Sequence, residues 1–359
     1  MGVSQSGHGN LHRLCRAIPA LDDGAATAAR NRQANLTKPP GSLGRLEDIS
    51  IRLAGICGDP RPRIHHKVAF TLAGDHGVVA EGVSAFPQSV SVQMVANFLA
   101  GGAAVNVLSR HVGARNVVAD IGLAGDVPGD KAGLRDLRVA RGTANMARGP
   151  AMSPAQMLQA VQAGAALVDQ EAAKGLDLAA TGEMGIGNTT PATAILCAMS
   201  RIAPEQVTGP GTGLDEAGVA HKARVIRRAL ALNRPDASDG WDVLMKVGGL
   251  EIAGLVGVIL GCAARRVPCV VDGFISTSAA VIAAKVAPRS GDFIFAGHRS
   301  KEPGHAHMLD LLGLEPILAL DMRLGEGTGA VLALSVVEAA ARILDEMATF
   351  TDAGVDSAL

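Results

Sequence analysis

A single carboxylate, Glu326, stands between glycines in the segment LDMRLGEGTGAVLAL, residues 320–334. An apolar run that reads as a strand precedes it, and an apolar run that reads as a helix follows it. Glycine allows unusual backbone angles and lets a ligand approach the chain closely. A plain turn would accept Asn or Asp as readily as Glu. The residue types therefore indicate a carboxylate that meets a ligand at this turn.

A second segment that could carry chemistry is TGEMGIGNTTPATAILCAM, residues 181–199, in which three glycines follow a predicted strand. Thr190 and Pro191 form a good N-cap and N1 pair, so a helix is expected to open there. Backbone N–H groups at such a helix start are suited to holding a phosphate. The segment matches neither the Walker loop nor the dinucleotide fingerprint. Two interpretations stay open: a phosphate cradle, or a tight turn whose glycines only relieve crowding.

Lys222, in EAGVAHKARVIRRALALN, could add a fixed positive charge to a phosphate site. Taken alone, it reads better as a solvated lysine on a helix surface.

The elements that must position these residues recur along the chain as short apolar runs, each ending in glycine and a polar residue. The runs cover residues 67–77, 116–122, 176–188, 267–274, 292–300 and 316–327. Apolar strands that alternate with helices indicate a parallel sheet covered on both faces. Ligands bind beyond the carboxyl ends of the strands in such sheets. Glu326 is therefore expected on the ligand-binding rim, and Asp75, His76 and Asp272 at other strand ends could support it.

The composition argues against several functional classes. The 359 residues carry a net charge of −1, so nothing indicates binding to nucleic acid or to a membrane surface. Aromatic residues make up 2% of the chain and tyrosine is absent, so stacking platforms for nucleic-acid bases are not expected. The apolar runs are too short to span a bilayer.

Cysteine and histidine spacing gives no sign of a metal site. The five cysteines lack CxxC spacing and are interpreted as reduced core residues of a cytoplasmic protein. The ten histidines form no HExxH pattern, and His305 and His307 are too close for a helical metal pair. We expect neither a metal nor a cofactor.

Six motifs together resemble one enzyme family. In chain order they are KPPGSLGRLE, AGDHGVVAEGVSAFPQ, TGEMGIGNTTPA, KVGGLEIAG, VDGFISTSAA and MRLGEGTGA, and they span roughly residues 36–345. They resemble the nicotinate-nucleotide–dimethylbenzimidazole phosphoribosyltransferase family of cobalamin nucleotide-loop assembly. The resemblance implies transfer of the phosphoribosyl group of nicotinate mononucleotide to 5,6-dimethylbenzimidazole, which gives α-ribazole 5′-phosphate and nicotinate.

The resemblance also implies an architecture. It is an α/β, three-layer Rossmann-like fold with a mainly parallel six-stranded sheet, a small helical domain and a homodimer. We expect residues 61–334 to form the large α/β catalytic domain. Residues 1–60 and 335–359 read as helical and are expected to form the small domain together.

Site residues carry over from the family by their positions in these motifs. The resemblance makes Glu326 the general base that takes the benzimidazole proton, and it places Glu183 near the ribose. Glu183 could there stabilise positive charge at C1′. The phosphate is expected to meet Gly185, Gly187, Asn188, Lys222 and Ser300. The apolar base pocket is expected to be lined by Phe86, Met94, Met184 and Leu324.

Two other functions fit parts of the same sequence. A nucleoside hydrolase would use Glu326 to activate water and would need the phosphate cradle without the apolar pocket. A non-catalytic nucleotide sensor would keep the cradle and would not need Glu326.

Overall fold

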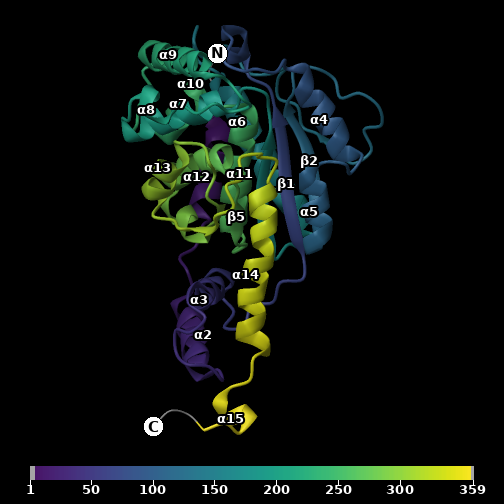
Figure 1. Cartoon of the computed structure of the whole chain (residues 1–359), viewed down its shortest axis with the longest axis vertical. Coiled ribbons are helices and arrows are strands. Elements are labelled where there is room, and N and C mark those ends of the chain that lie inside the picture. The colour runs from purple at the N-terminus through teal and green to yellow at the C-terminus, as the bar shows by residue number, and fades with distance from the viewer. Residues whose placement is uncertain (1–4, 357–359) are drawn as a thin grey trace.

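A single parallel sheet of seven strands organises the fold, in the order β3-β2-β1-β4-β5-β6-β7 (Figure 1). The computed structural model describes residues 5–356. The strands are β1 (Lys67–Gly74), β2 (Ala114–Gly122), β3 (Leu134–Asp136), β4 (Leu178–Met184), β5 (Cys269–Val271), β6 (Ile294–His298) and β7 (Pro316–Leu318). The α/β class and the parallel sheet that the sequence predicted are confirmed.

The predicted number of six strands is wrong by one. Each of the six apolar runs contains a strand, and the additional strand is β3, which pairs with β2 at the edge of the sheet. Its three residues are half-buried or exposed. An edge strand that buries little surface needs no apolar run, so the sequence pattern does not mark it.

The helices alternate with the strands, as a parallel sheet requires. They are α1 (Gln5–Arg16), α2 (Asp23–Asn35), α3 (Arg45–Cys57), α4 (Ser89–Leu99), α5 (Ala104–Val112), α6 (Pro154–Ala172), α7 (Thr189–Ser200), α8 (Pro204–Val207), α9 (Glu216–Asn233), α10 (Gly240–Val247), α11 (Leu250–Ala264), α12 (Phe274–Val286), α13 (His305–Leu312), α14 (Thr328–Glu346) and α15 (Phe350–Ala353), with 3₁₀ turns at Gly77–Glu81 and Pro288–Phe293.

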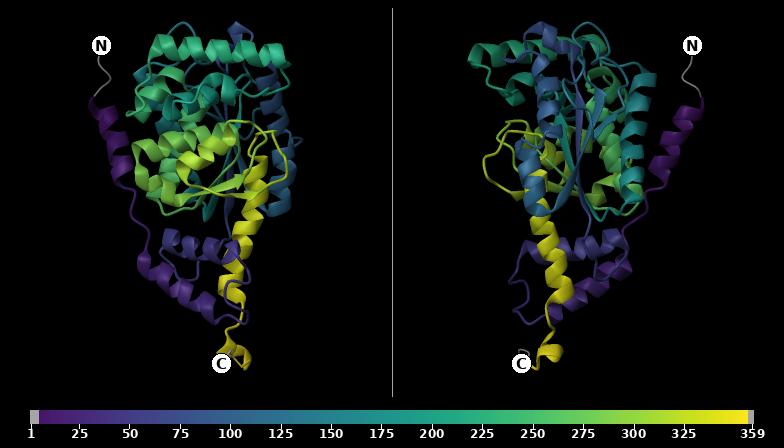
Figure 2. Two further views of the ribbon diagram at one scale, coloured as in Figure 1. Left: turned by 60° about the vertical axis from the view of Figure 1, so that its left-hand side comes forward. Right: turned by 90° about the vertical axis from the view of Figure 1, so that its right-hand side faces the viewer.

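Helices cover both faces of the sheet (Figure 2). On one face α11 contacts β1, β2, β4 and β5 and packs against α6 and α12. On the other face α14 contacts β4 to β7, and α5 contacts β2 and α14. Residues 250–263 of α11 are all buried, as suits a helix that is apolar all round apart from Glu251.

A helical extension lies below the sheet in Figure 1. It consists of α2, α3 and the last turns of α14, which contact one another. Arg32 of α2 donates to the carbonyl groups of Leu344, Asp345 and Met347 at 2.6, 3.1 and 2.9 Å, and so satisfies the end of α14.

The division into two domains stays a prediction. Helix α14 runs without a break across the predicted boundary at residue 334, and α1, which the prediction assigns to the small domain, contacts α6 and α11 beside the sheet. Residues 1–4 and 357–359 of the predicted small domain lie outside the described residues.

One helical stretch in the described chain, Ser89–Val112, is long and apolar enough to cross a membrane by length and composition alone. The stretch consists of two helices, α4 and α5, and one third of its apolar window is buried inside the protein. Helices of soluble proteins pass the same test, so this is weak evidence for a membrane span.

Candidate active site

A cavity of about 320 Å³ opens at the carboxyl ends of the strands. Strand order reverses there, because β1 and β4 are neighbours and later strands continue on one side while β2 and β3 lie on the other. Ligands of open α/β sheets bind at this kind of crevice. The walls come from α4 and from the segments that follow β4, β5, β6 and β7.

Nine of the eleven residues that the sequence predicted for the site line this one cavity. They are Phe86, Met94, Glu183, Met184, Gly185, Asn188, Ser300, Leu324 and Glu326. Gly187 and Lys222 are not part of the wall. Segments up to 240 residues apart along the chain therefore meet at one point, as the shared sheet rim predicted.

The turn that carries Glu326 has an unusual backbone. Gly325, Glu326 and Gly327 have φ angles of 85°, 65° and 98°, all in the left-handed region. This region suits glycine and costs a residue with a Cβ about 1–2 kcal/mol. Gly182 of β4 packs against the turn, since a Cβ on it would come within 2.3 Å of the Glu326 carbonyl oxygen. The chain thus accepts strain to hold a carboxylate at the cavity wall, which is common at functional sites.

The Glu326 side chain is 6% exposed. Its Oε2 atom accepts the N–H of Val105 in a long contact of 3.5 Å. Burial raises the pKa of the Glu326 carboxyl, and the negative charge of Asp272 raises it further. A carboxylate with a raised pKa is a better proton acceptor than a solvated one, so Glu326 has the properties of a general base.

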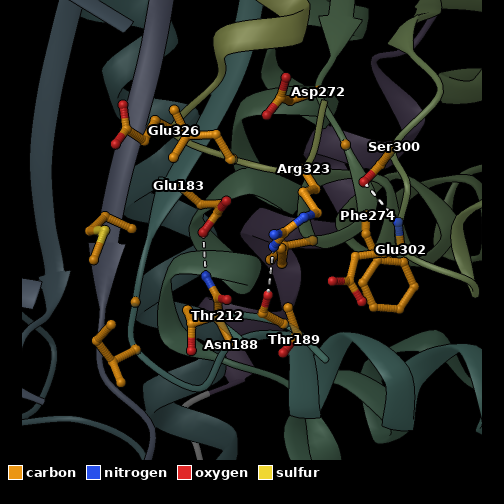
Figure 3. A pocket seen from close by; sticks show the side chains of 18 of the residues that line it. Glu183, Asn188, Thr189, Thr212, Asp272, Phe274, Ser300, Glu302, Arg323 and Glu326 are labelled. Carbon is orange, nitrogen blue, oxygen red and sulfur yellow. Dashed lines mark hydrogen bonds between the residues drawn. The ribbon is translucent and has the colours of Figure 1, made fainter. Parts of the chain in front are cut away.

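Glu183 lies beside this turn, and a Cβ on Gly325 would come within 2.5 Å of its Oε1 atom. The Asn188 side chain donates a hydrogen bond to Glu183 Oε2 (Figure 3). Burial, followed by the charges of Asp272 and Glu251, raises the pKa of Glu183 to about 8. The carboxyl is therefore mostly protonated at neutral pH when no ligand is bound.

Lys222 is 1% exposed, so its interpretation as a solvated helix lysine is wrong. It lies on the inner side of α9, and its Nζ donates to Thr189 Oγ1 at 2.5 Å and to the Gly209 carbonyl at 3.4 Å. Thr189 lines the cavity, so the ammonium group stands directly behind the wall. Burial lowers the pKa of Lys222 to about 8, although the nearby carboxylate of Glu302 favours its charged form.

The glycine-rich turn differs in detail from its prediction. Helix α7 begins at Thr189 with Asn188 as its N-cap, so Thr190 lies inside the first turn and is not the cap. The Thr190 hydroxyl has no hydrogen-bond partner among the described residues. The Asn188 N–H donates to the Gly185 carbonyl at 3.2 Å, and the Ile186 N–H donates to Ser91 Oγ at 3.0 Å. Two N–H groups of the turn are thus already engaged within the protein.

Part of the cavity wall is apolar. Phe86, Met94, Met184 and Leu324 line it together with Val90. Phe86 and Leu324 are exposed large apolar side chains, so they stand at the mouth, whereas Met94 and Met184 are partly buried. Apolar walls of this kind suit a flat ring.

Polar residues that sequence reasoning missed also line the cavity. Thr189, Thr212, Glu302 and Arg323 do so together with Ser300 (Figure 3), and the apolar residues Phe274 and Ile275 are part of the wall as well. The Arg323 Nη1 atom donates to the Gly211 carbonyl at 3.3 Å. A signal for Arg323 was present, because it lies three residues before Glu326 in the same motif.

Of Asp75, His76 and Asp272, which the sequence placed at other strand ends, Asp272 lines the cavity, as does His298 at the end of β6. Asp75 accepts hydrogen bonds from Ser91 Oγ at 2.6 Å and from the Ala124 N–H at 2.9 Å. His76 Nε2 lies 2.8 Å from Glu251 Oε1, and both side chains are buried behind the wall. Asp75 and His76 therefore support the rim without reaching the cavity.

Comparison with known proteins gives a consistent result. A family model described as phosphoribosyltransferase matches residues 18–355. The nicotinate-nucleotide–dimethylbenzimidazole phosphoribosyltransferase of Chloroflexus aggregans is 57% identical over 345 residues, which are 96% of this chain and 98% of that protein. The protein of the same name from Desulforamulus reducens is 56% identical over 339 residues, 94% of this chain and 96% of that protein.

A solved structure agrees with these sequence relatives. The crystal structure of CobT from Thermus thermophilus superposes with a TM-score of 0.89 at 46% identity, and the match covers 93% of this chain and 100% of that one. The described fold and nearly the full sequence are thus shared with these proteins, and the chain belongs to the nicotinate-nucleotide–dimethylbenzimidazole phosphoribosyltransferase family.

Proposed function

We propose that the protein transfers the phosphoribosyl group of nicotinate mononucleotide to 5,6-dimethylbenzimidazole, giving α-ribazole 5′-phosphate and nicotinate. One observation carries the proposal: the buried carboxylate of Glu326 stands in a cavity whose wall is partly apolar and partly polar, with Lys222 behind the polar residue Thr189. A heterocyclic base fits the apolar part of the wall, and a sugar phosphate fits the polar part.

The charge of the leaving group explains why the reaction needs one general base and no general acid. Nicotinate is bound to C1′ through a positively charged ring nitrogen, so it leaves as a neutral ring nitrogen and needs no general acid. The attacking benzimidazole nitrogen would become cationic unless the other ring N–H loses its proton. Glu326 takes this proton, and a well-placed base contributes typically about 10²–10⁴-fold to the rate. Attack opposite the departing nicotinate inverts C1′ and gives the α product.

Glu183 has a separate electrostatic role in this scheme. Its carboxyl is mostly neutral in the empty site, because its pKa is raised to about 8. The cationic nicotinate ring and the positive charge that develops at C1′ both favour the ionised carboxylate. Substrate binding therefore expels the proton from Glu183, and the resulting charge stabilises the transition state.

In this scheme the phosphate lies against the polar residues of the cavity wall. Lys222 supplies a charge from behind Thr189, and Arg323 and Ser300 are on the wall itself. Gly185, Gly187 and Asn188 form the adjoining turn, at the start of α7. The positive end of that helix further favours an anion.

Measuring nicotinate release with and without dimethylbenzimidazole tests the proposal. A transferase releases nicotinate only when the base is present and forms α-ribazole 5′-phosphate in equal amount. A hydrolase would release nicotinate without the base, and a sensor would release none in either case. Neither alternative finds support among the relatives named above.

We further propose that the protein acts as a homodimer in the cytoplasm. Its substrates are small molecules, and no nucleic-acid, membrane or cofactor requirement enters the mechanism. Light scattering of the purified protein at several concentrations tests the dimer, and a mass of one chain would contradict it.

A further inference from the structure

Asp272 lies at the end of β5 and joins it to the turn that carries Glu326. Its Oδ2 atom accepts the N–H of Gly327 at 3.2 Å, and its Oδ1 atom accepts the N–H of Ala330 at 2.8 Å. Gly327 directly follows Glu326, and Ala330 lies in the first turn of α14. A single buried carboxylate thus ties the start of this helix to the neighbouring strand.

The strained turn needs such an anchor. Glu326 has a left-handed backbone conformation, which a residue with a Cβ keeps only where the surroundings enforce it. The long contact from Val105 holds the Glu326 side chain only weakly, at 3.5 Å. Thr328 closes the turn locally, since its N–H and its hydroxyl donate to the Gly325 carbonyl at 3.1 and 2.9 Å. The two bonds to Asp272 tie the segment to another strand, and both are shorter than the 3.4 Å bond that Thr71 Oγ1 of β1 donates to the Glu326 carbonyl.

Asp272 also places charge at the site. It is 1% exposed, and burial raises the pKa of its carboxyl, whereas His298 Nε2 at 3.6 Å and the N–H groups of Ala330 and Gly327 act in the opposite direction and favour the ionised form. The charged groups that face Glu326 are Asp272 from the end of β5 and Glu183 from β4. Glu251 of α11 stands behind Glu183, and its charge adds to that of Asp272 there.

We propose that Asp272 is a positioning residue of this reaction: it fixes the turn that carries Glu326 and holds a negative charge behind that base. The inference rests on the role given to Glu326 in the proposed function. Asp272 does not itself exchange a proton with the substrate.

Asp272→Asn tests the proposal, because it keeps one acceptor oxygen and removes the charge. The loss of a negative neighbour lowers the pKa of Glu326. The acid limb of the kcat–pH profile, where Glu326 becomes protonated, should therefore move to lower pH by about one unit. We expect kcat to fall by about tenfold and KM to stay within about threefold. Asp272→Ser, a smaller neutral acceptor, should move the limb in the same direction, so a folding defect in one variant does not decide the result.

Asp120→Asn is the matched control. Asp120 is likewise fully buried at a strand end and accepts the N–H of Leu123 at 2.8 Å, but it does not line the cavity. This variant should leave the acid limb in place. An unmoved limb in both Asp272 variants, or an equal shift in Asp120→Asn, would overturn the proposal.

A double variant separates this inference from the proposed function. If Asp272 acts through Glu326, adding Asp272→Asn to Glu326→Gln should lower kcat no further, since residues that act as a unit are not additive. If the losses of kcat in the two single variants multiply in the double variant, the role of Asp272 is refuted and that of Glu326 is left intact. Near-normal turnover of Glu326→Gln alone would instead refute the proposed function.

Discussion

Lys222 gives the proposed phosphate site a pH dependence that can be worked out from the structure. Its pKa is lowered to about 8 by burial, so the ammonium group is charged below this pH and becomes neutral above it. The nucleotide phosphate has a second pKa of about 6 and stays a dianion from pH 7 upward. If only the charged lysine binds it well, affinity is lost as pH rises through about 8.

The size of the effect follows from the charged fraction. With a pKa of about 8, roughly nine tenths of Lys222 is charged at pH 7 and roughly one tenth at pH 9. KM for nicotinate mononucleotide should thus rise about tenfold between these pH values, which is about 1.4 kcal/mol. The full charge is worth more, since an ammonium about 5 Å from a phosphate contributes roughly 3 kcal/mol at an effective dielectric constant of about 20.

Steady-state kinetics at saturating dimethylbenzimidazole provide the assay. Lys222→Met should raise KM at pH 7 by up to about 150-fold, which corresponds to the roughly 3 kcal/mol of charge interaction, and should abolish the rise toward pH 9. Arg224→Ala is the matched control, because Arg224 is an exposed cation on the same helix. The unphosphorylated riboside should show neither effect. A flat KM for the native protein, or equal losses for nucleotide and riboside, would refute the reasoning.

Three further predictions concern the carboxylates and their turn. Glu326→Gln should lose at least about 100-fold in kcat with KM within a few-fold, because the base acts in the transition state; near-normal turnover would remove it from the mechanism. Glu183 ionises as pH rises through about 8, so kcat/KM should fall below this pH in the native protein and should lose this dependence in Glu183→Gln. If the fall remains in the variant, another group causes it. Gly325→Ala places a Cβ 2.5 Å from Glu183 Oε1 at a φ of 85°, so it should reduce both kcat and the melting temperature. Gly129 has a φ of 75° and open space around it, so Gly129→Ala should reduce the melting temperature and leave kcat unchanged. Equal activity losses in the two alanine variants would contradict the steric argument.

The rim of the sheet was predictable because its signals are local. Each long apolar run ends in glycine and a polar residue, so Glu183 and Glu326 could be placed on one edge without knowledge of the helices. Six motifs in family order added the reaction and the apolar pocket. The glycines on both sides of Glu326 indicated a turn with unusual backbone angles, which residues with a Cβ adopt only under strain.

The remaining features depend on packing, which a single sequence does not display. Lys222 looks like a surface lysine because its helix is polar, and its burial follows from the loop at Gly209 that covers it. The start of α7 was misplaced by two residues: its N-cap is Asn188, whose side chain makes no capping hydrogen bond and donates to Glu183 instead. Strand β3 was missed because it buries little apolar surface.

The removal of one ring proton by Glu326 is the central claim, and an N-methylated dimethylbenzimidazole tests it most directly. This ring keeps the shape and the apolar surface but lacks the N–H, and its methyl group would crowd the carboxylate. Plain benzimidazole is the control, since loss of the two ring methyl groups should cost only about 0.8 kcal/mol per buried carbon. Nicotinate release at matched concentrations should continue with benzimidazole and stop with the N-methylated ring. Equal release rates with the two rings would contradict proton abstraction by Glu326.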